Sequence, residues 1–437
     1  MPHREGGKRM RSDKIPAQNR RWYRLDNAAK IYPAIKNSNW NSLFRLSARL
    51  KETVDPAVLQ RALDRTVARF ECFRFRMHKG VFWYYLEENP GRPLIEEDVE
   101  NPLIRMNFKK NNYFLFRVRY FGRTVALELF HVVTDGTGAL IFLKTLIAEY
   151  LRQTGVDVPP GHGVLDLDGA PDPEEMEDSY RRYSNLNKVK SRRESRAWHV
   201  QGRDLPAHRL ILTTGEIPAS ALVRLVKERG VSVTEYLTAV YIRALYKLQR
   251  RQGKNRRPIK ISVPVNMRTF YPSKTLRNFA LYINVGIDPE YGEYSFDEIL
   301  TNVHNYMRYE LNAKFLNAQM AANVSSERSM LLRPVPLFLK NAGLQLAFNF
   351  WGEGKFTTSY SNLGVVDVPD EMRPHIERFD FLLGSPKNNK INMASITFED
   401  KLAVNFSRTI LDPAVEREFF TFLVRQGIPV KLESNQR

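Results

Sequence analysis

Alternating hydrophobic and polar positions in the first part of the chain predict a sheet covered by helices. Residues 43–50 alternate in this way, which is typical of a strand with one buried face. A helix is predicted over residues 56–70, because Asp55 can cap it, Pro56 suits its first turn and apolar residues recur every three or four positions. Further strands are expected over residues 72–77, 81–86, 103–108, 114–120 and 125–130, followed by a helix from about 138 to 155. The pattern indicates an α+β arrangement with an antiparallel or mixed sheet.

The second part of the chain repeats this mixture of helices and strands. Helices are expected over residues 218–228 and 233–249, the second opening with a capping box formed by Ser232 and Glu235. The remaining expected elements are strands at 259–265, 279–287, 356–360, 379–383, 391–398 and 402–407, a helical region at 296–350 interrupted near Pro334 and Pro336, and a final helix at 413–425.

Between the two parts, periodicity disappears. Residues 156–198 are punctuated by proline and glycine and carry an acidic block followed by a basic block, as expected of a linker or crossover. The predicted organisation is therefore a flexible basic tail (1–20), a first domain (21–155), the linker (156–198) and a second domain (199–437).

Composition narrows the class of protein. With 437 residues, 43% of them hydrophobic, the chain can bury the cores of two domains. A single cysteine, Cys72, excludes an intrachain disulfide and cysteine-rich metal sites. The basic start lacks the apolar segment of a secretory signal, and no run of about 18 apolar residues is present. We expect a cytoplasmic protein, and peripheral membrane contact through the tail and residues 334–346 stays open.

The net charge of +19 favours acidic ligands or surfaces. Basic clusters at residues 181–196 and 243–260 lack the interleaved aromatic residues that stack on bases and match no recognition motif. A solvated basic face is the preferred interpretation, and no nucleic-acid partner is expected. The sequence also lacks a glycine-rich phosphate loop, a zinc-protease motif and a serine nucleophile elbow.

The segment from Phe130 to Gly138 carries the candidate chemistry. It places His131 at the end of an alternating strand and Asp135-Gly136 four residues later, directly before an amphipathic helix. A histidine there can take a proton from an alcohol or an amine. Two other interpretations stay open from these residues alone: a hydrogen-bonded histidine without a chemical role, and a metal pair with Asp135, although two ligands do not make a metal site.

This segment resembles the H-x-x-x-D-G active-site motif of the superfamily of chloramphenicol acetyltransferase, the condensation domains of peptide synthetases, mycobacterial polyketide-associated acyltransferases and alcohol acetyltransferases. Members with one histidine before the spacer are most similar, because Phe130 stands where condensation domains have another histidine. Over residues 20–430 three further segments resemble family segments in order: 263–268 (P-V-D-L-R, with Asn266 for the usual Asp), 278–279 (G-N, with Arg277 for the usual Gly) and 361–364 (S-N-x-G).

The resemblance implies an α/β sandwich of two chloramphenicol acetyltransferase-like domains flanking a central channel, with His131 at its middle. It implies an acyltransferase, similar to alcohol O-acetyltransferases, that moves an acyl group from acyl-CoA or an acyl carrier protein to a hydroxyl or amine acceptor, without a metal or a permanently bound cofactor. The alternatives are a catalytically silent binding or scaffold protein on the same fold and a stand-alone peptide condensation enzyme, which Phe130 disfavours.

The resemblance also assigns roles to residues. His131, Asp135 and Gly136 form the catalytic motif, with His131 as the general base. Arg268 matches the partner of Asp135 in a structural ion pair, the alternative being an unrelated surface arginine. Ser361 and Asn362 are the candidate donors to the oxyanion, and Asn362 has the alternative role of capping a turn before Gly364.

Overall fold

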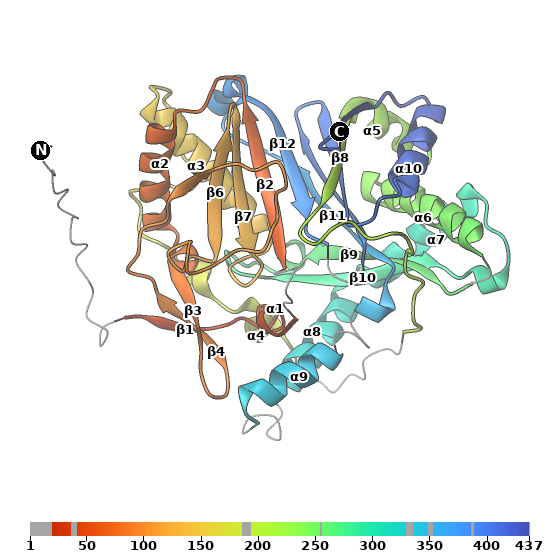
Figure 1. Cartoon of the computed structure of the whole chain (residues 1–437), viewed down its shortest axis with the longest axis horizontal. Coiled ribbons are helices and arrows are strands. Elements are labelled where there is room, and N and C mark those ends of the chain that lie inside the picture. The colour runs from red at the N-terminus through yellow and green to blue at the C-terminus, as the bar shows by residue number, and fades with distance from the viewer. Residues whose placement is uncertain are drawn as a thin grey trace, which may run out of the picture.

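The computed structural model describes residues 20–35, 42–185, 194–253, 256–328, 335–347, 353–385 and 389–436. Two lobes lie side by side, each built from a sheet with helices packed against it (Figure 1). This mixture of helices with antiparallel and parallel strands confirms the predicted α+β class.

The first lobe contains a five-stranded sheet in the order β12-β2-β7-β6-β5. Its strands are β2 (Leu43–Leu50), β5 (Ile95–Glu97), β6 (Phe116–Phe121), β7 (Thr124–Phe130) and β12 (Ile376–Leu383). The helices α2 (Pro56–Arg69) and α3 (Gly136–Gln153) pack together and share a core with these strands. The predicted start of α2 is confirmed, because Asp55 Oδ1 accepts hydrogen bonds from the backbone of Ala57 and Val58.

Strand β12 joins this sheet from the second half of the sequence. It pairs antiparallel with β2, with Phe381 opposite Leu46 and Ile376 opposite Leu50. The pattern at residues 379–383 predicts a strand and says nothing about its partner, because the pairing spans more than three hundred residues of sequence. The sheet of the first lobe is therefore incomplete without a segment from the second half.

A small hairpin sheet borders the first lobe. It consists of β1 (Trp22–Arg24), β3 (Phe75–Lys79) and β4 (Tyr84–Glu88), with the 3-10 helix η2 (Glu71–Phe73) before β3. The strand predicted at residues 103–108 is wrong. Leu103 has a φ of 61° and its backbone N–H donates to Glu128 Oε1 at 3.0 Å, so the segment turns and its apolar residues fill the core without strand pairing.

The second lobe contains a seven-stranded sheet in the order β10-β9-β11-β13-β14-β8-β15. In chain order its strands are β8 (Ile211–Pro218), β9 (Ile259–Asn266), β10 (Ala280–Ile287), β11 (Thr358–Val365), β13 (Ile391–Phe398), β14 (Lys401–Arg408) and β15 (Lys431–Ser434). The main helices of this lobe are α5 (Ala219–Glu228), α6 (Val233–Gln252), α7 (Phe296–Glu310) and α10 (Ala414–Arg425). The capping box of Ser232 and Glu235 opens α6 as predicted.

Further helices complete the described chain. They are the helices α1 (Tyr32–Ile35), α4 (Ser179–Tyr183), α8 (Ala313–Arg328) and α9 (Leu337–Ala347) and the 3-10 helices η3 (Pro173–Met176), η4 (Met267–Thr269), η5 (Pro289–Tyr291), η8 (Glu353–Lys355) and η9 (Asp370–His375). The described part of the predicted helical region 296–350 forms three helices. The predicted interruption is confirmed at Pro336, which precedes α9, while Pro334 lies outside the described residues. None of the helices in the described ranges is both long and apolar enough to cross a bilayer.

Candidate active site

His131 directly follows β7 and lies where the two lobes meet. Its backbone N–H donates to the carbonyl of Ser42 at 3.1 Å, which fixes the end of the strand. The side chain lines a cavity of about 260 Å³. Tyr32 and Phe44 from the first half of the sequence and Ser361, Asn362 and Phe381 from the second half also line this cavity. The structure therefore brings five of the six predicted site residues to one cavity: His131, Asp135, Gly136, Ser361 and Asn362.

The hydrogen bonds of Asn278 determine the tautomer of His131. Asn278 Nδ2 lies 3.0 Å from the carbonyl oxygen of His131 and 3.1 Å from Asp26 Oδ2. Both partners are acceptors, so the amide nitrogen must face them and Asn278 Oδ1 must face His131 Nδ1, at 2.9 Å. Because that oxygen can only accept, Nδ1 carries the proton and Nε2 keeps its lone pair.

Aromatic contacts hold the His131 ring in place. The Tyr32 ring stacks on it with centroids 4.6 Å apart and planes 17° apart, and the Phe44 ring lies at 4.9 Å with a tilt of 57°. Across the described ranges no group hydrogen-bonds to Nε2. Burial lowers the pKa of His131 below its ordinary value of 6.5, and the charge of Asp135 opposes this shift only in part. The imidazole is therefore neutral at pH 7 and can accept a proton.

Asp135 caps the helix that follows His131. Its Oδ1 accepts from the backbone N–H of Gly138 at 3.2 Å, and its Oδ2 accepts from the backbone N–H of Phe279 and from Arg268 Nη1, each at 2.8 Å. Three donors therefore occupy the carboxylate. Within the part of the chain that the structure describes, no group of three or more His, Cys, Asp or Glu side chains is placed to hold a metal ion.

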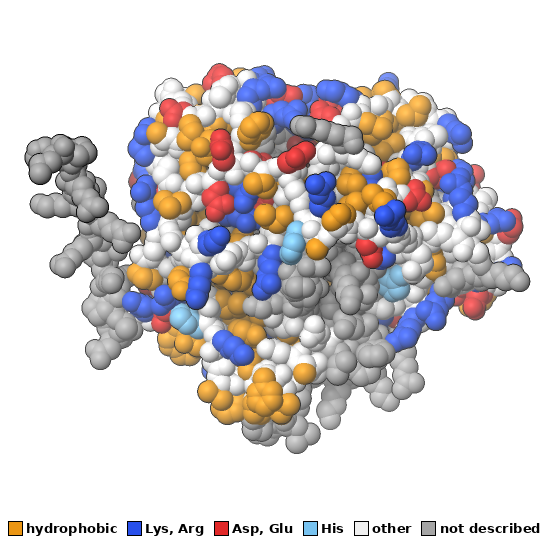
Figure 2. All heavy atoms as spheres, in the orientation of Figure 1, with side chains coloured by type: hydrophobic (Ala, Val, Ile, Leu, Met, Phe, Trp, Pro, Cys, Tyr) orange, Lys and Arg blue, Asp and Glu red, His pale blue; other side chains and the backbone are white. Residues whose placement is uncertain are grey.

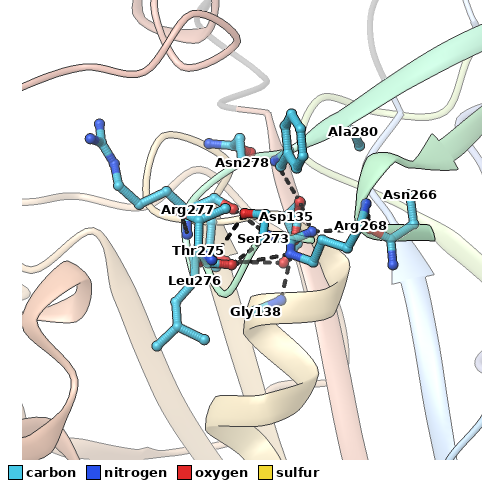
Figure 3. A network of polar contacts seen from close by, with 12 residues as sticks. Asp135, Gly138, Asn266, Arg268, Ser273, Thr275, Leu276, Arg277, Asn278 and Ala280 are labelled. Atoms are coloured by element: carbon cyan, nitrogen blue, oxygen red, sulfur yellow. Dashed lines mark hydrogen bonds and ion pairs between the residues drawn. The ribbon is translucent and has the colours of Figure 1, made fainter. Parts of the chain in front are cut away.

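Arg268 joins Asp135 to the loop of residues 275–279 (Figure 3). Besides Asp135, its guanidinium donates to the carbonyl oxygens of Thr275, at 2.9 and 3.1 Å, and of Arg277, at 2.7 Å. That loop carries Asn278. The ion pair therefore acts on His131 indirectly, because it fixes the backbone that presents the Asn278 amide.

Asn266 and Arg277, the two residues that differ from the family segments, both belong to this network. Asn266 Oδ1 accepts from the backbone N–H of Arg268 at 3.1 Å and from its Nη1 at 3.2 Å, so it supplies an acceptor without a second negative charge. The buried Arg277 side chain donates to the carbonyl of Arg24 at 2.7 Å and lies 3.7 Å from Asp26 Oδ2. It therefore ties the segment that carries Asp26 to the loop that carries Asn278.

The two glycines at the start of α3 allow close approach of the two halves. A Cβ on Gly138 would lie 2.3 Å from the carbonyl oxygen of Leu276, and a Cβ on Gly136 would lie 2.7 Å from Leu363 Cδ2. A side chain at position 138 would be tolerated less well than one at position 136, because its Cβ would meet a backbone atom of Leu276, whereas the Leu363 side chain can move.

Ser361 and Asn362 lie on β11, on the cavity wall. Asn362 Oδ1 accepts from the backbone N–H of Gly364 at 2.9 Å, and its Nδ2 donates to Thr234 Oγ1 at 2.9 Å. Gly364 has a φ of 73°, which glycine adopts readily. Asn362 thus makes the turn-capping contact, while no described group hydrogen-bonds to the Ser361 hydroxyl. The role of either residue toward an oxyanion stays a prediction.

Asp26 and Tyr32 have no counterpart in the sequence analysis. They come from residues 20–35, where neither periodicity nor a motif points to a site. Asn278 belongs to a recognised segment, yet only its contacts show that it faces His131.

No family model matches the sequence, and no curated protein matches it. Polyketide synthase associated protein 5 from Mycobacterium tuberculosis is similar in structure, with a TM-score of 0.60 at 14% identity over 92% of this chain and 96% of that one. The trichothecene 15-O-acetyltransferase TRI3 from Fusarium sporotrichioides gives 0.59 at 12% identity over 95% and 96%.

A variant of the starter condensation domain of rhizomide synthetase, solved in complex with C8-CoA, gives a TM-score of 0.55 at 13% identity over 92% of this chain and 94% of that one. Such identities show the fold alone. The chain has the two-lobed fold of chloramphenicol acetyltransferase-like acyltransferases and condensation domains, which confirms the fold that the resemblance implies.

Proposed function

We propose that this protein is an acyltransferase that moves an acyl group from an acyl thioester to a hydroxyl or amine acceptor. The observation that carries the proposal is His131 Nε2, kept as a proton acceptor by the contact of Asn278 with Nδ1, in a cavity where the lobes meet. Neighbours of the same fold include an acetyltransferase and a domain solved with C8-CoA, which supports acyl-CoA as a donor. An acyl carrier protein is the other donor that we expect.

The reaction follows from this geometry. As the acceptor oxygen or nitrogen attacks the thioester carbonyl, its proton passes to His131 Nε2. The new bond leaves an oxyanion, to which the Ser361 hydroxyl is our candidate donor. When the carbon–sulfur bond breaks, the departing thiolate takes the proton from Nε2, so His131 returns to its neutral form. Burial raises the pKa of the Cys72 thiol to about 12, which favours direct transfer over a cysteine acyl-enzyme.

The cavity lining favours an apolar group on at least one substrate. Tyr32, Phe44, Phe356, Leu363 and Phe381 contribute apolar or aromatic surface. Activity of the alcohol O-acetyltransferase type fits this enclosure. Phe130 is fully buried and packs near Phe108, so its place is part of the core, which disfavours a condensation enzyme with two adjacent histidines. We expect a cytoplasmic location, as the single buried cysteine suits a reducing compartment.

A panel of acyl-CoA donors against alcohol and amine acceptors, followed by release of free thiol, tests the proposal. Replacing the base in His131→Ala should lower turnover by about a hundredfold to ten-thousandfold. The matched control is His304→Ala, which removes a histidine of α7 that contacts Glu235 in the second lobe. The control should keep its turnover.

Turnover of His131→Ala within threefold of the original protein would contradict the role of His131. In the absence of an acceptor, an active site should still hydrolyse acyl-CoA slowly. This slow hydrolysis should also depend on His131. If the folded protein releases no thiol from any donor, the scaffold alternative replaces the proposed one.

A further inference from the structure

Two segments far apart in sequence form one projecting end of the molecule. The turn between β3 and β4 contacts α9: the backbone N–H of Leu337 donates to the carbonyl of Val81 at 2.9 Å, and Lys340 Nζ donates to the carbonyl of Phe82 at 3.1 Å. Asn341 Nδ2 donates to the Tyr84 hydroxyl at 2.8 Å. Both segments extend beyond the sheets at the lower edge of Figure 1.

This end exposes large apolar side chains, which we call the apolar tip. Figure 2 shows hydrophobic side chains gathered at the same lower edge. Soluble monomers rarely leave so many large apolar side chains together in water unless the surface has a partner. The apolar tip consists of Val81 (72% exposed), Phe82 (43%), Trp83 (41%), Phe338 (64%), Leu339 (52%) and Leu344 (38%).

Positive charge lies directly beside the apolar tip. Lys340 Nζ is 3.5 Å from the centre of the Trp83 ring, and partial burial there lowers the pKa of Lys340. A neighbouring hollow of about 790 Å³ is lined by tip residues, by the exposed Trp22 and by the cations Arg24, Lys30 and Arg181. Arg181 also pairs with Asp178 at 3.3 Å, a carboxylate that does not itself line the hollow.

We propose that the apolar tip docks the protein onto an anionic lipid bilayer. Aromatic and aliphatic side chains on projecting segments suit the interface between headgroups and acyl chains, and flanking lysine and arginine suit lipid phosphates. The two segments project from the body of the molecule, as insertion into a lipid surface requires. The overall charge of +19 adds to the attraction toward a negative surface.

The apolar tip also lies close to the candidate active site. Helix α9 contacts α1, and Tyr32 of α1 stacks on His131. If the proposed acyl transfer holds, docking would bring the cavity near a membrane-dissolved substrate. The docking itself does not depend on acyl transfer and is measured without a substrate.

Co-sedimentation of the full chain with lipid vesicles tests the docking. The probes are vesicles of phosphatidylcholine alone and vesicles in which phosphatidylglycerol replaces part of it. We expect binding to the anionic vesicles to be about tenfold stronger or more, and to weaken as salt rises. Phe338→Ser combined with Leu339→Ser should lower that binding about tenfold or more, because both side chains lose their apolar contact with lipid.

The matched control combines Phe121→Ser with Leu432→Ser, which changes the same residue types at 69% and 57% exposure on β6 and β15. It should bind as the original protein does, and both double variants should keep its thermal unfolding midpoint. Several results would overturn the proposal: no vesicle binding, equal binding to neutral and anionic vesicles, or equal loss in both double variants. Self-association that only the Phe338 and Leu339 variant abolishes, without vesicle binding, would make the tip a contact between copies. Vesicle binding without thiol release would overturn only the proposed function.

Discussion

Asn278 contacts His131 twice, through Oδ1 to the ring and through Nδ2 to the backbone carbonyl. The second Nδ2 bond reaches Asp26, which is fully buried and lies near the Arg277 guanidinium. A rotated amide would place its oxygen against two acceptors, so Asp26 keeps the amide in one orientation. The orientation and tautomer of His131 are thus set by residues that need not touch a substrate.

Asn278→Ala should lower turnover by about tenfold to a hundredfold, the usual cost of removing a partner that orients a functional histidine. Without the amide, Nδ1 loses its acceptor, and the imidazole can place its proton on Nε2 instead. The control is Asn405→Ala, which removes another buried asparagine, on β14, that accepts from Thr214. It should lose stability but keep turnover. Equal turnover losses in both variants would mean that the Asn278 effect reflects damage to the fold.

The acid limb of the pH–rate profile should have its midpoint below 6.5. His131 acts as a base only when neutral, and burial lowers its pKa in the folded protein. The active form therefore persists as pH falls through 6.5 and is lost when pH falls through the lower pKa. Measurement of kcat/KM between about pH 4.5 and 8 reports this ionisation of the free enzyme. A midpoint at or above 6.5 would contradict the burial argument.

The loop of residues 275–279 and the start of α3 act together. Asp135 and Arg268 bridge them, so removing either residue releases the same loop. We expect Asp135→Ala and Arg268→Ala each to lower turnover, and the double variant to be little worse than either single one. Thiol release by all three variants gives the coupling, and losses that simply add would show that the pair does not act as a unit.

Gly138→Ala tests the close approach of this loop to α3. The new Cβ would lie 2.2 Å from Thr134 Oγ1 and 2.3 Å from the carbonyl oxygen of Leu276, so the loop must move. Turnover and the unfolding midpoint should both fall. Gly343→Ala on α9 is the control, because its Cβ meets nothing within 4 Å and alanine favours a helix. A Gly138 variant as stable and active as this control would show that the contact is not needed.

Local signals predicted elements well where the contacts that form them are local. Asp55 before α2 and the Ser232–Glu235 pair before α6 make the capping contacts that their positions predict. Arg117 and Arg119 show where this reasoning ends. They alternate with Phe116 and Val118 along β6, a pattern typical of a solvated face, yet both are buried and pair with Glu128 and Glu96. Glu128 lies across the β6–β7 hairpin and Glu96 lies on the parallel strand β5, so the pairing that buries these charges depends on the register between strands and not on the periodicity within one strand.

The candidate site likewise combines residues that the local sequence predicts with residues that only the fold brings together. The motif places His131 and Asp135 on either side of a turn, because strand, turn and helix are continuous in sequence. Tyr32 and Asn278 contact His131 from distant segments, and Asp26 acts on it through Asn278; only the folded chain places them there. The place of His131 at the cavity was therefore predictable from the sequence, and the groups that orient its ring were not.

At the scale of the whole molecule, the cavity and the first sheet both need residues from the two halves. His131 comes from the first half, and Ser361 and Asn362 come from the second. Strand β12 also comes from the second half of the sequence, and it pairs along its length with β2 from the first half. The two halves of the sequence are therefore joined by backbone hydrogen bonds within the first lobe, although the domain boundaries at 155 and 199 stay a prediction.

Because β12 pairs with β2, we can predict how a chain cut within the predicted linker behaves. A protease recognition sequence in place of residues 186–193 allows cleavage after folding. The two pieces should stay together on gel filtration, because β12 still pairs with β2 and no described strand pairing is cut. Thiol release by the cut protein should match that of the uncut variant. Residues 1–198 and 199–437 produced separately should each release no thiol, since the first lacks β12 and the second lacks His131. Separation of the pieces without denaturant would contradict the joined sheet, and activity in the first piece alone would contradict a site shared by both lobes.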